Sequence, residues 1–87
     1  MGAVAVILPT KGISAERALA TVGAQIIIIL DRPQSVSATF DGLTDARRNA
    51  GLKEPVTFDW FSLALTVLYT IGLVDYDDRE NLVRCGP

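Results

Sequence analysis

The sequence predicts a mainly α-helical domain with a small β element, arranged like a winged helix-turn-helix: a strand, three helices and a C-terminal β-hairpin wing. Two observations carry this prediction. Three stretches with helical apolar spacing each follow a serine or threonine that can cap a helix, and each ends at a glycine or before a proline. Two short β-prone pieces then enclose a polar turn. A chain of 87 residues has room for one core, so residues 1–87 are expected to form a single domain.

The first two elements are predicted before Pro33. Residues 3–8 (AVAVIL) are rich in valine and isoleucine and are closed by Pro9, which favours an extended segment or edge strand. Ser14 is the predicted N-cap of a helix that ends before Pro33, because proline disfavours helical geometry at the residue before it. The four consecutive isoleucines at 26–29 are assigned to this helix, although β-branched residues also favour strands.

The second and third helices are predicted from their caps. The second helix starts after Ser35 or Val36 and is ended by Gly51. Thr57 is the N-cap candidate of the third helix, and Gly72 is placed to terminate it. The third helix is apolar nearly all round, which is typical of a helix that is buried or lies at an interface. Its aromatic first turn supplies the expected structural anchors, which are Phe58, Trp60 and Phe61.

The apolar third stretch is too short to favour a membrane span. Its uncharged part, residues 60–74, would be roughly 22 Å long as a helix, against a hydrocarbon core of ~30 Å. Acidic residues flank both ends, and no Lys/Arg cluster is present to fix an orientation. We therefore expect no membrane association and a cytoplasmic location.

The C-terminal hairpin is predicted from residues 73–76 and 82–84, on either side of a polar, turn-forming centre. The hairpin carries the acidic residues Asp75, Asp77 and Asp78. Their spacing lacks the glycine and the terminal glutamate of an EF-hand loop, so no metal site is expected.

Composition argues against an enzyme. The chain contains no histidine and one cysteine, Cys85, which leaves no intrachain disulfide and no zinc cluster. It also has no glycine-rich phosphate loop and no nucleophile with a base at a recognisable spacing. We expect no catalytic residue and no cofactor.

DNA reading by the third helix is disfavoured. The second helix of a helix-turn-helix motif presents Arg, Lys, Asn or Gln to base edges, and residues 58–71 contain none of these. The net charge of −2 gives no global attraction for nucleic acid. Weak candidates for phosphate contacts remain near the end of the second helix, with solvated surface charges as the alternative for each: Arg47, Arg48 and Lys53.

Partner binding is better supported, at two places. An exposed edge strand offers unpaired backbone groups to another chain, which makes the candidate contacts Leu8, Pro9, Thr10 and Lys11. The alternative is a strand that packs within its own domain. Consecutive isoleucines on a helix point around most of its circumference, so one or two must face away from the core, and the second set of candidates is Ile26, Ile27, Ile28 and Ile29.

Several stretches resemble a known family. ILPTKGIS, ERAL and VGAQI near the start, the LDRPQSVS turn and above all PVTFDWFSLALTVLYTIGLVD are similar to the middle components of bacterial ABC-three component systems, closest to the middle component 6 family. The resemblance implies a small adaptor without chemistry of its own, which bridges a Rad50- or SMC-type ABC ATPase and an effector or accessory subunit in defence against phages or plasmids. A second copy of the chain is a further candidate partner, and DNA would be contacted through the complex. The alternative function is an autonomous winged-helix transcription regulator.

Overall fold

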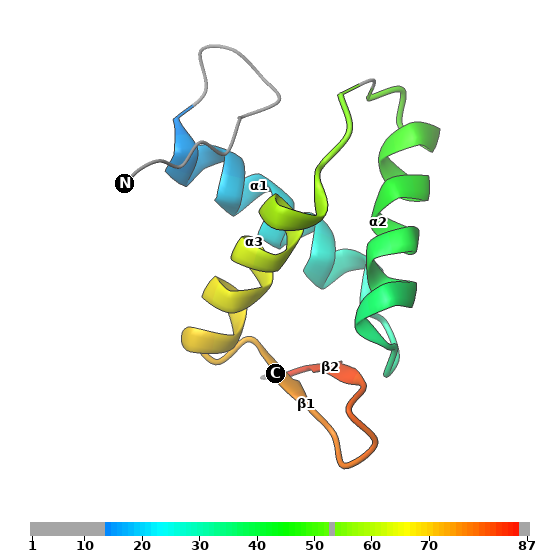
Figure 1. Cartoon of the computed structure of the whole chain (residues 1–87), viewed down its shortest axis with the longest axis vertical. Coiled ribbons are helices and arrows are strands. Elements are labelled where there is room, and N and C mark those ends of the chain that lie inside the picture. Colours follow the sequence, from blue (N-terminus) through cyan, green and yellow to red (C-terminus); the bar gives the residue numbers. More distant parts are fainter. Residues whose placement is uncertain (1–13, 53, 86–87) are drawn as a thin grey trace.

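The computed structural model describes residues 14–52 and 54–85, which form three helices followed by a β-hairpin (Figure 1). The elements are α1 (Ala15–Ile29), α2 (Val36–Asn49), α3 (Phe58–Thr70), β1 (Val74–Tyr76) and β2 (Leu82–Arg84). The predicted order of three helices and a C-terminal hairpin is confirmed. The strand predicted over residues 3–8 lies outside the described residues.

The helix ends are set by local signals. Each helix begins after a hydroxyl side chain that accepts a hydrogen bond from the backbone N–H three residues on, with distances of 3.2 Å (Ser14 from Arg17), 3.0 Å (Ser35 from Ala38) and 3.2 Å (Thr57 from Trp60). Two glycines just beyond α2 and α3 adopt left-handed φ angles of 82° and 85°, at Gly51 and Gly72. The predicted caps are therefore confirmed, and the isoleucine run is helical.

The core lies between the three helices and the base of the hairpin. Helix α1 packs against both α2 and α3. A Cβ atom built on Gly23 of α1 would lie 3.4 Å from Leu68 Cδ2 of α3, so the missing side chain allows these two helices to approach closely. The largest fully buried side chains come from every element of the fold and from the segment after α1: Phe61, Ile26, Leu30, Leu43, Leu82, Val74 and Thr39.

Three aromatic rings join α2 to the first turn of α3. The Phe40 centroid lies 5.2 Å from that of Phe58 and 5.1 Å from that of Phe61, and the two α3 rings are 5.6 Å apart. Phe61 is fully buried and Trp60 is nearly so, whereas Phe58 remains half exposed. Such tilted and edge-on ring pairs contribute about 0.5–1.5 kcal/mol beyond the area that they bury.

The hairpin is tied back to the helices through the segment that joins α1 to α2. Strands β1 and β2 pair antiparallel, with Asp75 opposite Val83. On the other side of β2, Leu82 exchanges two backbone hydrogen bonds with Gln34, at 2.7 and 3.1 Å. The α1–α2 connection therefore lies beside β2 as a third extended segment.

The hairpin turn is organised by one carboxylate. Asp77 Oδ1 accepts hydrogen bonds from the backbone N–H groups of Arg79 at 2.8 Å and Asn81 at 2.9 Å. These bonds hold the pKa of the Asp77 carboxyl below its usual range, the bond from Asn81 having the largest effect. Glu80 adopts a left-handed φ of 64°, which the tight turn requires. Among the acidic residues of the hairpin, Asp77 thus has a structural role, which is to hold the turn.

Candidate partner-binding surfaces

The isoleucine run at the end of α1 is divided between the interior and the surface. Ile26 is 0% exposed and belongs to the core, whereas Ile28 is 72% exposed. Ile27 and Ile29 are half-buried and pack against the core. A helix turns by about 100° per residue, so consecutive side chains cannot share one face. The four predicted contacts therefore do not form one surface: Ile26 has no exposed area to offer a partner, and Ile28 is the residue that points outward.

Ile28 borders an apolar hollow of about 160 Å³ between the C-terminal halves of α1 and α2. Leu52, 43% exposed, lines the hollow just beyond the end of α2. The remaining lining is Gln25, Ile29, Leu43, Ala46, Arg47 and Ala50. This α1–α2 groove has the size for one or two apolar side chains from another molecule, an inference from ordinary side-chain volumes and packing.

Arg47, one of the weak DNA-contact candidates, is held within the fold. Its Nη1 donates to Gln25 Oε1 at 2.9 Å, and its Nη2 donates to the Glu54 carbonyl at 3.1 Å. The side chain thereby connects α1, α2 and the segment that leads into α3. Arg48 is exposed and forms an ion pair with Asp45 at 3.1 Å. Lys53 lies outside the described residues, as do Leu8, Pro9, Thr10 and Lys11.

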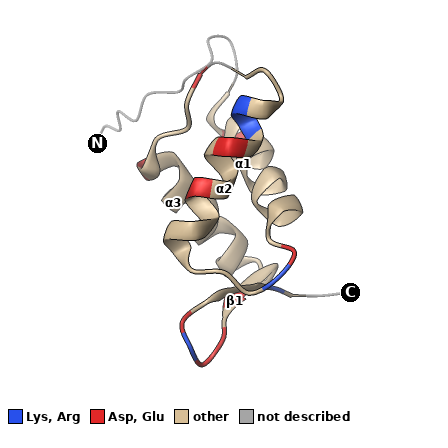
Figure 2. Cartoon of the chain, turned by 90° about the vertical axis from the view of Figure 1, so that its right-hand side faces the viewer, with Lys and Arg blue, Asp and Glu red and all other residues tan. Residues whose placement is uncertain are grey.

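The exposed face of α3 is apolar and almost uncharged. Three apolar side chains follow one another at a spacing of four residues and are each more than two-fifths exposed: Leu63, Val67 and Ile71. Asp59 is the sole charged residue within α3. The β-hairpin differs from α3, because its turn projects from the helices and carries both acidic and basic residues (Figure 2). Within the described residues, α3 thus presents no Arg, Lys, Asn or Gln to a DNA base edge.

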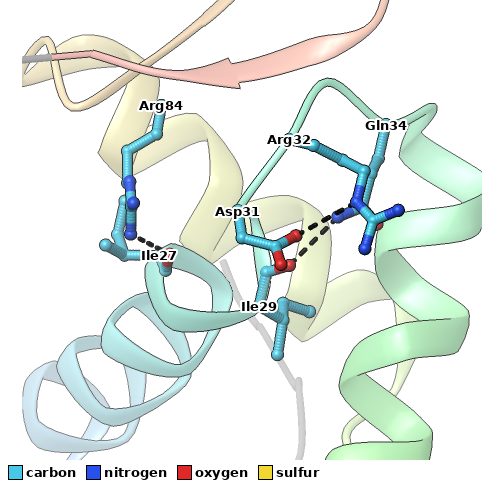
Figure 3. Close-up of polar contacts among 6 residues, drawn as sticks. All are labelled: Ile27, Ile29, Asp31, Arg32, Gln34 and Arg84. Carbon is cyan, nitrogen blue, oxygen red and sulfur yellow. Dashed lines mark hydrogen bonds and ion pairs between the residues drawn. The ribbon is translucent and has the colours of Figure 1, made fainter.

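Two side chains that the sequence did not single out as structural hold the end of α1 (Figure 3). Arg84 Nη1 in β2 donates to the Ile27 carbonyl at 2.9 Å, and Gln34 Nε2 donates to the Ile29 carbonyl at 3.0 Å. The last carbonyls of a helix have no intrahelical partner, and a cation there also complements the helix dipole. The last turn of α1 contains no basic residue. This absence could have indicated that its final carbonyls accept hydrogen bonds from side chains of other segments.

A comparison with protein families identifies the chain. The family model for the ABC-three component (ABC-3C) system Middle Component 6 matches residues 8–85. The chain belongs to this family. No curated protein and no solved structure matches it.

Membership in Middle Component 6 confirms the resemblance found in the sequence, and its name implies a system with other subunits. The matched range contains the α1–α2 groove, the exposed face of α3 and the N-terminal candidates from Leu8 to Lys11. Across residues 14–52 and 54–85, the helices are all too short or insufficiently apolar to cross a membrane.

Proposed function

We propose that this Middle Component 6 protein is a non-catalytic adaptor subunit. It bridges a Rad50- or SMC-type ABC ATPase and an effector or accessory subunit of a bacterial three-component system that acts against phages or plasmids in the cytoplasm. The observation that carries the proposal is the family match over residues 8–85. An adaptor needs surfaces that other chains can cover, and the α1–α2 groove supplies one of these.

The proposal includes a winged-helix architecture for the domain. Its support is the element order, in which the antiparallel hairpin follows three helices, and the pairing of Gln34 with Leu82, which adds the α1–α2 connection to the edge of β2. In this arrangement α2 and α3 form the helix-turn-helix pair. The apolar surface of α3 then serves protein contacts in place of base readout.

The partner-facing side of the adaptor is proposed to centre on Ile28, together with the N-terminal candidates Leu8, Pro9, Thr10 and Lys11. An isoleucine that is 72% exposed beside an apolar hollow is a favourable site for an apolar side chain of a partner. Most of the groove lining is apolar, and its one charged residue, Arg47, directs its guanidinium to acceptors within the fold, Gln25 and the Glu54 carbonyl. Affinity at this site is therefore expected to come from apolar burial and to depend weakly on salt.

The alternative function, an autonomous DNA-binding regulator, has weaker support. Arg47 and Arg84 both donate to protein acceptors, and α3 carries no cation. Arg48→Glu, which leaves the structural contacts of Arg47 in place, is expected to leave DNA binding by the assembled complex unchanged. A loss of binding in a salt-dependent assay would favour phosphate contacts by this protein.

Co-purification tests the adaptor function directly. The tagged protein is expressed together with the products of its neighbouring genes, and the ATPase and effector subunits are expected to follow the tag. The Ile28→Arg variant should lose at least one of these subunits, since it places a charge in the apolar contact. Ala38→Arg, which adds the same charge at an exposed α2 position, should retain both. Recovery of the tagged protein without any ATPase subunit would contradict the proposal.

A further inference from the structure

A hollow of about 220 Å³ lies between the start of α2, one side of α3 and the hairpin. Tyr69 of α3 and Tyr76 of β1 both line it, with ring centroids 6.0 Å apart and an interplanar angle of 53°. The two residues are 53% and 46% exposed, so their rings are open to another molecule. The remaining lining, which shares no residue with the α1–α2 groove, is Val36, Ser62, Leu65 and Thr66. We call these six residues the tyrosine hollow.

We propose that the tyrosine hollow binds an extended, positively charged segment of another protein. A proline or aliphatic side chain of the segment packs against the two rings, which is a common use of exposed aromatic pairs. Lys or Arg side chains on either side of that residue face carboxylates at the two ends of the hollow. This is a second interaction surface, and it depends neither on Ile28 nor on the adaptor role.

Carboxylates lie beside both ends of the hollow. Asp59 precedes Ser62 by three residues, about one helical turn, so the two residues share a side of α3. At the other end, Asp75 Oδ1 accepts a hydrogen bond from the Tyr76 N–H at 2.7 Å, which places this carboxylate next to the tyrosine. Both aspartates are exposed, and among the described residues the lining includes no Lys or Arg. This charge pattern attracts a basic segment and repels the phosphates of a nucleic acid.

The tyrosine hydroxyls favour an extended segment over a helix. Neither phenolic oxygen has a hydrogen-bond partner among the residues that the structure describes. A helix uses its carbonyls internally, whereas an extended or polyproline segment leaves them free to accept hydrogen bonds from such donors. Asp59 lies ten residues before Tyr69, about 15 Å along the helix axis, and an extended chain covers that distance in about five residues. The segment should therefore carry a basic residue about five positions from the residue that packs on the rings.

Selection from a phage library of random peptides, about twelve residues long, tests the proposal on the full chain. Peptides enriched on the immobilised parent protein should contain Lys or Arg about five positions from a proline or aliphatic residue. The double variant Tyr69→Ala, Tyr76→Ala should lose these peptides, whereas Ile28→Ser, changed at the α1–α2 groove, should retain them. Thermal unfolding checks that both variants fold. A selection that enriches no peptide, or only peptides without a basic residue, would overturn the proposal.

Fluorescence anisotropy with one labelled peptide from the selection then tests the charges. Asp59→Asn keeps both rings and should weaken binding by about threefold. Asp41→Asn, which neutralises an exposed α2 carboxylate outside the lining, should leave the Kd unchanged. Equal effects of these two variants would contradict the assigned role of Asp59.

A labelled oligothymidine is the probe for the other class of ligand that stacks on aromatic rings. The parent protein should not bind it. Binding that Tyr76→Ala abolishes would assign the hollow to single-stranded nucleic acid and overturn the proposal. All of these measurements use the chain without other subunits, so their failure leaves the co-purification result intact.

Discussion

Helices α1 and α3 are both rich in apolar residues, but they use them in opposite ways. The end of α1 carries four consecutive isoleucines, yet Ile28 is the strongly exposed one, and side chains from two other segments bond the carbonyls of Ile27 and Ile29. Helix α3 buries Trp60 and Phe61 in the core and still exposes regularly spaced apolar side chains, including Leu63 and Val67, on its other side. An unbroken apolar run therefore gives little information about exposed area on a half-buried helix. Regular spacing on the face opposite the core is the more informative pattern.

The largest expected effect on stability distinguishes Ile26 from Ile28, which lie two residues apart in α1 but differ in burial. Ile26→Ala removes a fully buried side chain from between the helices and should lower the free energy of unfolding by about 2–5 kcal/mol. Ile28→Ala removes an exposed one and should change it by less than about 0.5 kcal/mol. Urea denaturation of both variants measures the difference. Similar losses at the two positions would mean that Ile28 is covered in the free protein.

The next effect concerns how the two helices end. Gly72, just beyond the end of α3, has a φ of 85°, a conformation in which a Cβ costs about 1–2 kcal/mol, so Gly72→Ala should lower the free energy of unfolding by that amount. No heavy atom from the rest of the fold lies within 4 Å of a Cβ at this position, so the cost arises from the local backbone and not from packing. Gly42→Ala, inside α2, has ordinary helical geometry and provides the control, for which a gain in stability is expected from helix propensity. An unchanged free energy of unfolding in Gly72→Ala would show that the turn can adopt another backbone conformation.

Helix α1 ends without a glycine, and side chains from other segments bond its last carbonyls. Removing one of these hydrogen bonds should have a smaller effect on stability. Arg84→Met keeps most of the aliphatic length but removes the hydrogen bond to the Ile27 carbonyl, which should cost about 0.5–1 kcal/mol because the site is exposed to solvent. Arg32→Met removes an exposed ion pair of 3.5 Å and should have almost no effect. Faster hydrogen exchange in the last turn of α1, seen only in Arg84→Met, would locate the loss.

The smallest effect lies in the hairpin, away from both helices. The pKa of Asp77 is lowered in the folded protein, so its carboxylate stabilises the fold above the unfolded pKa of about 3.9, and that contribution is lost as pH falls through the folded value. The urea midpoint of the parent protein should therefore fall more between pH 5 and pH 2 than that of Asp77→Asn. The amide retains an oxygen acceptor but does not titrate. Parallel curves for the two proteins would remove the role assigned to Asp77.

Much of the fold could be predicted because its boundaries are encoded locally. Ser14, Ser35 and Thr57 each cap a helix through a hydrogen bond spanning three residues, and Gly51 and Gly72 end two of them. These signals depend on the nearest neighbours in the chain. They can be recognised without knowing how the helices pack.

The surfaces could be predicted only in part, because exposure depends on how each helix is rotated against its neighbours. The sequence required that some isoleucine of α1 face outward but could not identify Ile28. It also gave no means of placing Arg47 against Gln25, 22 residues away, or Arg84 against Ile27, 57 residues away. In α3 the apolar excess was recognised, yet the division into buried and exposed sides required the position of α1.

The contact between Arg84 and Ile27 also has a consequence for the order of events during synthesis. Helix α1 is translated before its partners: the guanidinium of Arg84 follows Ile27 by 57 residues, and β2, which pairs with Gln34, also follows α1. The nascent protein therefore holds an unfinished α1, with unpaired carbonyls beside exposed isoleucines, until β2 has emerged. The emergence of β2, more than that of any one helix, is therefore the step that completes the end of α1.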